Sequence, residues 1–299
     1  MTQIRTNSGG RLWFALLVVG MACTLPERIL AQSAAPQHAD VVYATVDGKD
    51  LALDIYMPPG VESPPLLIWV HGGAWSRGSK AQARLEFVEA GIATASLDFR
   101  QSTEAQFPAA IHDIKAAIRF LRANASTYGY RTDRIAISGN SSGGHYAALV
   151  GVSNGHPALE GTVGDHPNQS SDIQAIISYY GASNLTTILA QSTPFGLGVR
   201  EPALTRLLGA LPDDTKDLAE LASPVFQVDR GDPPLLLLHG DQDPQMPINQ
   251  AHELVGAYKQ LGLDVTFDVV HGSAHGGRAF HRDEHLTSAL DFLSRTIGR

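Results

Sequence analysis

A serine between two glycines lies at position 141, in the segment 139–143 (GNSSG). Residues 134–138 (RIAIS) before it have the composition of a strand, and residues 142–152 after it have apolar side chains at helical spacing. A serine at a sharp strand-to-helix turn exposes its hydroxyl. The Gly-x-Ser-x-Gly pattern alone is weak evidence, because an ordinary serine in a glycine-rich turn also produces it. The strand–turn–helix context favours Ser141 as the nucleophile of an acyl transfer.

The carboxylate that such a serine needs is expected in the segment 239–244 (HGDQDP), which follows the apolar strand Leu235–Leu238. A histidine takes the proton of the serine hydroxyl, and a carboxylate orients that histidine and stabilises its cation. We expect Asp243 to have this role, because it lies late in the loop, directly before Pro244. Asp241 instead suits the capping of backbone N–H groups in the turn.

The histidine base is expected in the segment 271–277 (HGSAHGG), after the strand Val265–Val270. We expect His275 rather than His271, because His275 lies well beyond the strand end, among small residues that permit a long loop. A histidine in this position can reach back to a serine at the same edge of the sheet. The order Ser, Asp, His along the chain is the order found in α/β-hydrolases.

Backbone donors for a reaction intermediate are expected in the loop 71–75 (HGGAW), directly after the buried strand Leu66–Val70. An acyl-transfer intermediate carries a negatively charged oxygen, and N–H groups on a glycine-rich loop can approach it closely. The sequence therefore predicts an oxyanion hole made by the N–H groups of Gly72, Gly73 and Ser142.

Four further residues have side chains that could take part in chemistry. We expect Trp75 to form a wall of the substrate pocket, with core packing as the alternative, and His71 to lie at the pocket while chiefly shaping the loop. His281 and His285 are four residues apart on a predicted helix and could form a metal pair. No His-Glu-x-x-His pattern accompanies them, so a solvated helix face is the better interpretation. The predicted chemistry needs no metal and no cofactor.

These loops must be positioned by strands that end at one edge of a sheet. Two β-rich runs, Val41–Val46 and Leu51–Met57, surround a turn signal and predict an antiparallel hairpin. Strands alternate with helices after it, which predicts a mostly parallel sheet with helices on both faces. The expected strands are 66–70, 92–97, 134–138, 173–180, 235–238 and 265–270, and the expected helices are 79–90, 108–123, 142–152, 248–261 and 284–296.

Residues 153–172 and 184–232 do not fit this alternation. Both are rich in Gly, Pro, Ser and Asn, with only short helical stretches such as Pro202–Leu208. We interpret them as cap-like insertions over the C-terminal edge of the sheet, where ligands bind in such folds. The catalytic domain is expected to span residues 41–299, after a polar linker at 32–40.

The N-terminal residues have the composition of a targeting segment. Arg5 and Arg11 precede an apolar run of about eleven residues. This run is too short to cross a bilayer and suits a signal-peptide core. We predict a signal peptide at 1–31 and a secreted or periplasmic protein without a membrane span after processing. A membrane anchor is the alternative. Lipidation of Cys23, the only cysteine, is less favoured because Gly20 matches the usual leucine poorly.

The composition of the chain is that of a globular protein, with 43% hydrophobic residues and a formal net charge of -8. A net negative charge argues against nucleic acid and anionic membranes as partners, since their binding depends on basic patches. It suits an enzyme that acts on small or polysaccharide-linked molecules. The sequence carries no signal for a particular oligomeric state.

Taken together, these segments resemble the α/β-hydrolase esterases related to hormone-sensitive lipase, and among them the bifunctional feruloyl and acetyl-xylan esterases. The resemblance implies a mostly parallel eight-stranded α/β-hydrolase sheet with small cap insertions. It also implies the triad Ser141, Asp243 and His275 and the oxyanion donors named above. Related enzymes often have alanine after the nucleophile, where this chain has Ser142. The motifs that carry the resemblance are HGGAW at 71–75, DFR at 98–100, FPAAIHDIKAAIRFLRANA at 107–125, DRIAISGNSSGGHYAAL at 133–149, SSDIQAIISYYGASNL at 170–185, HGDQDPQMP at 239–247 and HGSAHGG at 271–277.

The expected function is a serine ester hydrolase that acts through an acyl-enzyme on short-chain or carbohydrate-linked esters, with acetyl or feruloyl groups. An amide-cleaving hydrolase of the same fold, of the peptidase or formamidase type, is the first alternative. A non-catalytic binding module is the second, although such modules generally lack a member of the triad.

Overall fold

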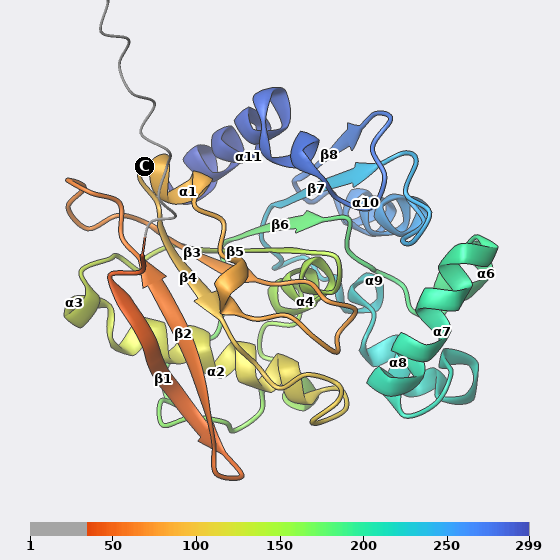
Figure 1. Ribbon diagram of the computed structural model, residues 1–299, viewed down its shortest axis with the longest axis horizontal. Coiled ribbons are helices and arrows are strands. Elements are labelled where there is room, and N and C mark those ends of the chain that lie inside the picture. The colour runs from red at the N-terminus through yellow and green to blue at the C-terminus, as the bar shows by residue number, and fades with distance from the viewer. Residues whose placement is uncertain (1–34, 299) are drawn as a thin grey trace, which may run out of the picture. The chain divides into compact units, whose positions relative to one another are not determined.

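The computed structural model describes residues 35–298, which contain one eight-stranded sheet in the order β1-β2-β4-β3-β5-β6-β7-β8 (Figure 1). The hairpin strands β1 and β2 are antiparallel to their neighbours, and β3 to β8 are parallel. The expected sheet is therefore present. The strands are β1 (His38–Val46), β2 (Lys49–Tyr56), β3 (Leu66–Val70), β4 (Ala93–Leu97), β5 (Ile135–Asn140), β6 (Ala175–Tyr179), β7 (Leu235–Gly240) and β8 (Val265–Val270).

Helices cover both faces of this sheet. Side chains alternate between the two faces along each strand, so each strand contributes residues to two cores. Leu66, Ile68 and Val70 of β3 lie in one core with α2, α4 and α10, whereas Leu67 and Trp69 lie in a second core with α1 and α11 (Figure 1). The helices that frame these cores are α1 (Glu86–Glu89), α2 (Ala109–Ala123), α4 (Ser142–Gly151), α10 (Asn249–Leu261) and α11 (Asp283–Thr296).

The N-terminal boundary differs from the predicted one. Strand β1 begins at His38, inside the segment 32–40 that was expected to be a linker. Asp47 and Gly48, which connect β1 to β2, both have positive φ, as a tight hairpin turn requires. The predicted signal peptide at 1–31 and Cys23 lie outside the described residues. Within residues 35–298, no helix combines the length and apolar character that a membrane crossing requires.

The segment 79–90 contains less helix than predicted. It forms a 3₁₀ turn, η1 (Lys80–Gln82), and the single-turn helix α1. Lys80 is held in place by the sheet: its N–H donates to Asp98 Oδ1 at 2.8 Å, and its Nζ donates to Asp54 Oδ1 at 2.6 Å. These tertiary contacts override the local helix propensity.

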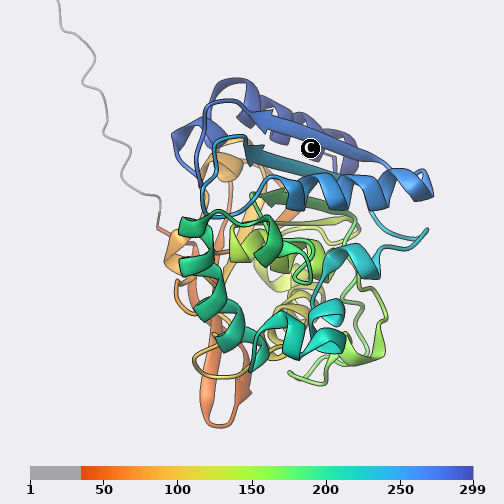
Figure 2. The ribbon, with the colours of Figure 1, turned by 90° about the vertical axis from the view of Figure 1, so that its right-hand side faces the viewer.

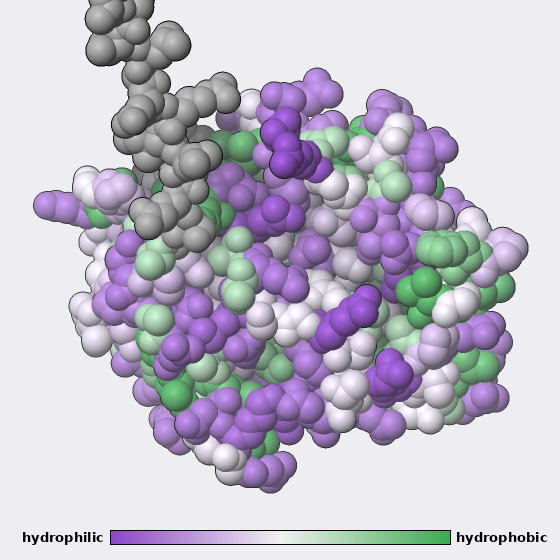
Figure 3. Space-filling model, in the orientation of Figure 1, coloured by the Kyte–Doolittle hydropathy of each residue, from purple (hydrophilic) through white to green (hydrophobic). Residues whose placement is uncertain are grey.

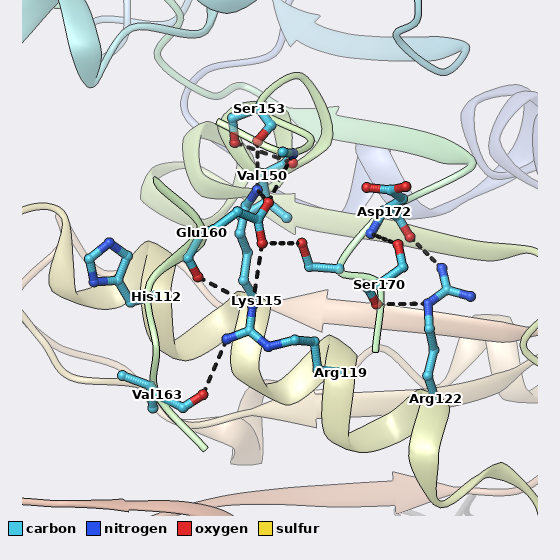
Figure 4. Close-up of polar contacts among 12 residues, drawn as sticks. His112, Lys115, Arg119, Arg122, Val150, Ser153, Glu160, Val163, Ser170 and Asp172 are labelled. Carbon is cyan, nitrogen blue, oxygen red and sulfur yellow. Dashed lines mark hydrogen bonds and ion pairs between the residues drawn. The ribbon is translucent and has the colours of Figure 1, made fainter. Parts of the chain in front are cut away.

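The segment 153–172 does not lie over the C-terminal edge of the sheet, so that prediction is wrong. Helix α4 starts at the C-terminal edge and runs back, and β6 starts at the N-terminal edge, so the residues that join them must lie at the N-terminal edge. The segment, which includes α5 (Pro157–Glu160), packs along α2 (Figure 4). His112 Nε2 lies 3.0 Å from the carbonyl oxygen of Ala158 in this contact.

Two cations of α2 and one carboxylate fasten this segment. Lys115, whose side chain is fully buried, donates to the Ser153 carbonyl at 2.7 Å and to Glu160 Oε1 at 2.5 Å. Arg119 Nη1 lies 3.3 Å from Glu160 Oε2 (Figure 4). Burial lowers the pKa of Lys115, and the neighbouring Glu160 carboxylate opposes that shift. We call Lys115, Arg119 and Glu160 the α2 clamp.

Replacing Glu160 with glutamine should lower the free energy of unfolding by about 3 kcal/mol, because it leaves the buried Lys115 cation without its counter-ion. The double variant Lys115→Met/Glu160→Gln also removes the buried Lys115 cation and should recover part of this loss, while Arg119 keeps the carbonyl oxygens of Glu160 and Val163 as acceptors. Urea unfolding followed by circular dichroism measures both changes. Equal unfolding midpoints for Glu160→Gln and the unmodified protein would show that the α2 clamp contributes no stability.

The second insertion, 184–232, partly meets the prediction. Its helices α6 (Ile188–Gln191) and α7 (Pro194–Leu208) lie beyond the ends of β6 and β7, at the edge where parallel strands finish (Figures 1 and 2). Helix α7 starts eight residues before the predicted stretch, because Thr193 Oγ1 caps it by accepting the Gly196 N–H at 3.0 Å. Hydrophobic residues gather over α6 and α7 on the face in Figure 3. The remaining helices, α8 (Lys216–Leu221) and α9 (Pro224–Gln227), lead back toward β7.

Candidate active site

Ser141 occupies a strained turn between β5 and α4, with φ 55° and ψ −121°. The glycines around it permit this turn. A Cβ on Gly139 would lie 2.3 Å from the Gly143 carbonyl oxygen, and a Cβ on Gly143 would lie 2.1 Å from the carbonyl oxygen of Val70. Strand β5, helix α4 and the end of β3 therefore approach more closely than any side chain allows, which aims the Ser141 hydroxyl outward.

The three side chains predicted to act together are in contact. His275 Nε2 lies 2.8 Å from Ser141 Oγ, and His275 Nδ1 lies 2.6 Å from Asp243 Oδ2. With Nδ1–H donating to the carboxylate, Nε2 is left as an acceptor for the serine proton. The Asp243 side chain is fully buried and the His275 side chain is 11% exposed. The arrangement can deprotonate Ser141 and hold the resulting imidazolium.

Asp243 is held as an anion. Burial opposes its ionisation, but contacts with His239 and His275 and backbone N–H donors outweigh burial and lower the pKa of the carboxyl. The donors on Oδ1 are the N–H groups of Gln245 and Met246, at 2.8 and 2.9 Å. His239 was not predicted to be part of the site; its Nε2 lies 3.5 Å from Asp243 Oδ2.

Asp241 and His271, the alternatives to Asp243 and His275 in the same two loops, pair with each other. Asp241 Oδ1 accepts the Gly272 N–H at 2.8 Å, and Asp241 Oδ2 lies 2.8 Å from His271 Nδ1. Asp241 thus caps a turn, as its position suggested. The side chain of His271 is 83% exposed.

The predicted oxyanion donors need one correction. The Gly72 N–H donates to Asn140 Oδ1 at 3.0 Å, so it is occupied and unavailable to an intermediate. The next residues along the loop, Gly73 and Ala74, line the cavity beside Ser141. Within residues 35–298, the N–H groups of Gly73, Ala74 and Ser142 have no hydrogen-bond acceptor. Ala74, with φ 53°, therefore offers a free N–H beside Ser141, whereas Gly72 does not.

His71 and Trp75 do not line the cavity, so their assignment to the substrate pocket is wrong. His71 stacks on Phe99 with ring centroids 4.5 Å apart, and its Nδ1 lies 2.8 Å from the Gly72 carbonyl oxygen. Trp75 is 1% exposed, and its indole N–H donates to His145 Nδ1 at 2.9 Å. Burial lowers the pKa of His145 to about 4, so this histidine is neutral and can accept. The side chains of His71 and Trp75 thus pack against the core under their own loop and fix its shape.

A cavity of about 390 Å³ opens beside Ser141 and His275. The Tyr180 ring lies at its side, with its centroid 4.9 Å from that of His275, and Asn140 Nδ2 donates to the Tyr180 hydroxyl at 3.4 Å. Tyr180 follows the end of β6, so the rule that ligands bind at the ends of parallel strands could have identified it. No motif identifies the lining residues that the sequence analysis missed on α7 and in the Asp243 loop, which are Val199, Arg200 and Gln245.

His281 and His285 do not contact each other; each lies against a carboxylate. His281 Nδ1 lies 3.0 Å from Glu86 Oε1, and His285 Nδ1 lies 2.9 Å from Asp268 Oδ2. The expectation of a solvated helix face is therefore wrong for both. In the described part of the chain, no three His, Cys, Asp or Glu side chains lie close enough together to hold a metal ion.

Comparison with known proteins agrees with this geometry. The chain is 32% identical over 277 residues to the esterase LipQ of Mycobacterium tuberculosis, an alignment that covers 89% of this chain and 64% of LipQ. The chain thus spans less than two thirds of the length of that relative.

Two solved structures are similar over most of both chains. One is a truncated carbohydrate esterase from gut microbiota, with a TM-score of 0.80 and 31% identity, covering 88% of this chain and 96% of the other. Another is an esterase of the Planctomycetes species Thermogutta terrifontis, Est2, with a TM-score of 0.69 and 28% identity, covering 86% and 92%. The fold is therefore that of the α/β-hydrolases. The family model BD-FAE matches residues 53–258, and the chain belongs to the BD-FAE family.

Proposed function

We propose that this protein is a serine carboxylic-ester hydrolase in which Ser141, His275 and Asp243 form the catalytic triad. The observation that carries the proposal is the continuous contact from Asp243 Oδ2 through the His275 ring to Ser141 Oγ, at 2.6 and 2.8 Å. The relatives LipQ and the gut carbohydrate esterase are described as esterases, which supports this reaction class.

In the proposed reaction, Ser141 Oγ attacks the carbonyl carbon of the ester while His275 Nε2 takes the hydroxyl proton. The intermediate oxygen receives hydrogen bonds from the N–H groups of Gly73, Ala74 and Ser142. The bond to the alcohol breaks as His275 returns the proton to the leaving oxygen, which leaves an acyl-enzyme. Water, deprotonated by His275, then attacks the acyl group and releases the acid and Ser141.

The proposed substrates are short-chain or carbohydrate-linked esters, with acetyl or feruloyl as the acyl group. Thermogutta Est2 has been solved with propionate bound and with butyrate bound, and the gut relative is a carbohydrate esterase. The bound acids support a short acyl group, and the carbohydrate esterase supports a saccharide as the alcohol. We further propose that the protein acts outside the cytoplasm, as the composition of residues 1–31 suggests.

A fluorophosphonate probe should label this protein at Ser141, and labelling should block hydrolysis of 4-nitrophenyl acetate, because the probe traps an activated serine. Peptide mass spectrometry locates the label. A panel of 4-nitrophenyl esters, acetylated xylan, methyl ferulate and an aryl formamide then ranks the acyl groups. Faster cleavage of the formamide than of every ester would instead indicate an amide hydrolase, and the lack of any labelling would indicate a binding module.

A further inference from the structure

Arginines gather at the mouth of the candidate active site. Arg77 and Arg200 line the cavity beside Ser141. A second cavity of about 310 Å³ adjoins it, since Gly277 lines both, and this second cavity is lined by Arg84, Arg278 and Arg282. No aspartate or glutamate lines either cavity. A chain with a formal net charge of -8 therefore concentrates positive charge at its candidate active site. We call these five residues the arginine rim.

The rim charges are not neutralised by ion pairs within residues 35–298. The arginines that form ion pairs in this part of the chain lie elsewhere, and are Arg100, Arg119, Arg131 and Arg295. Glu86, which lines neither cavity, lies against His281 at 3.0 Å and is close enough to Arg84 for their charges to interact, without an ion-pair contact. Unpaired guanidinium groups at the wall of a cavity attract an anionic ligand and repel a cationic one.

Arg200 supplies the deepest of these charges. It is 1% exposed, its Nε donates to the Gln245 carbonyl at 3.1 Å, and its guanidinium lies 5.6 Å from the Trp75 ring centroid. Its Nη1 is buried without a hydrogen-bond partner among the described residues. Burial lowers the pKa of Arg200 to about 10, with the Asp243 carboxylate acting against the shift, so the group stays charged at neutral pH. Arg200 forms no ion-pair contact among the described residues, and its buried charge therefore acts strongly on a ligand in the cavity.

We propose that the arginine rim binds carboxylate groups of the substrate, so that the preferred substrates are acyl esters of acidic saccharides, those that contain uronic acid residues. This inference rests on the ester hydrolase function proposed above. Guanidinium groups match carboxylates geometrically, because each can form two parallel hydrogen bonds to one carboxylate.

The arginine rim extends over two cavities, which indicates that the carboxylates belong to the alcohol part of the ester rather than to its acyl group. A short acyl group fills only part of one cavity, whereas the five arginines line two adjoining cavities of about 390 and 310 Å³. A saccharide with carboxylates on successive residues is large enough to reach both. The acyl group can then remain small and neutral.

The test compares two esters that differ only in charge: an O-acetylated methyl glycoside of a uronic acid disaccharide with both carboxylates free, and the same compound with both carboxylates converted to primary amides. Acetate release should give a kcat/KM about tenfold higher for the carboxylate at about 0.02 M NaCl. This preference should shrink at about 0.5 M NaCl, because salt screens exposed charges. Equal kcat/KM values for the two compounds at low salt would overturn the inference.

Arg278→Gln/Arg282→Gln should lower the carboxylate-to-amide ratio by about threefold to tenfold, since both side chains are exposed at the second cavity. The matched control, Arg230→Gln/Lys259→Gln, removes two exposed charges at the opposite edge of the sheet and should keep the wild-type ratio. An equal fall in both variants would also overturn the inference, because it would reflect net charge. Hydrolysis of 4-nitrophenyl acetate by the unmodified protein separates these outcomes from failure of the ester hydrolase proposal itself.

Discussion

Alanine at position 141 should lower kcat/KM for 4-nitrophenyl acetate by about 10⁴-fold or more, because it removes the atom that attacks the ester. The fold should survive. Residue 141 has φ 55°, a conformation equally unfavourable for serine and alanine, and its hydroxyl contacts only His275 among the described side chains. Steady-state kinetics on the purified variant measures the loss, and a thermal melt by circular dichroism checks the fold.

Ser273→Ala is a matched control for this variant. Ser273 lies in the same loop as His275, but its contacts are made by the backbone: its N–H donates to Val270 and its carbonyl accepts from Gln242. The control should retain activity within about threefold, as surface changes away from special contacts do. A folded Ser141→Ala protein with more than about 1% of wild-type kcat/KM would show that another group attacks the ester.

The parts of the fold that the sequence predicted well are those fixed by burial. Residues 66–70 and 235–238 are short, continuous apolar runs, and they lie buried on both faces in β3 and β7. Such runs are typical of strands in the middle of a parallel sheet. Strands β5 and β8 run parallel to β3 and β7, so the loops that carry Ser141 and His275 leave the sheet at the same edge. This is why the contact between Ser141 and His275 could be anticipated from the sequence.

The errors concern contacts that no local pattern encodes. The motif at 71–75 indicates a donor loop, but the occupied N–H depends on Asn140, a residue far along the chain. The segment 153–172 has the composition of a surface insertion, and its position follows from the direction of α4. Arg200 lies on a helix without a clear apolar stripe, and its burial results from packing against Trp75.

Changing each of the two carboxylates of the 239–244 loop to asparagine should have very different effects on kcat. Asp243→Asn should lower kcat by about 10³- to 10⁴-fold, because Asp243 Oδ1 accepts the N–H groups of Gln245 and Met246. The amide oxygen of an asparagine would keep those donors, which turns its NH₂ group toward His275 Nδ1. His275 must then accept at Nδ1 and carry its proton on Nε2, where it can no longer take a proton from Ser141.

Asp241→Asn is the matched control, with the same change two residues earlier in the same loop. Its amide oxygen can still accept the Gly272 N–H that Asp241 Oδ1 accepts at 2.8 Å, so kcat should stay within about threefold of the unmodified protein. Both variants are compared across the pH range, since a histidine held in the wrong tautomer is not rescued at higher pH. Comparable losses in the two variants would mean that the loop acts as a unit, and that contact with His275 is not what distinguishes Asp243.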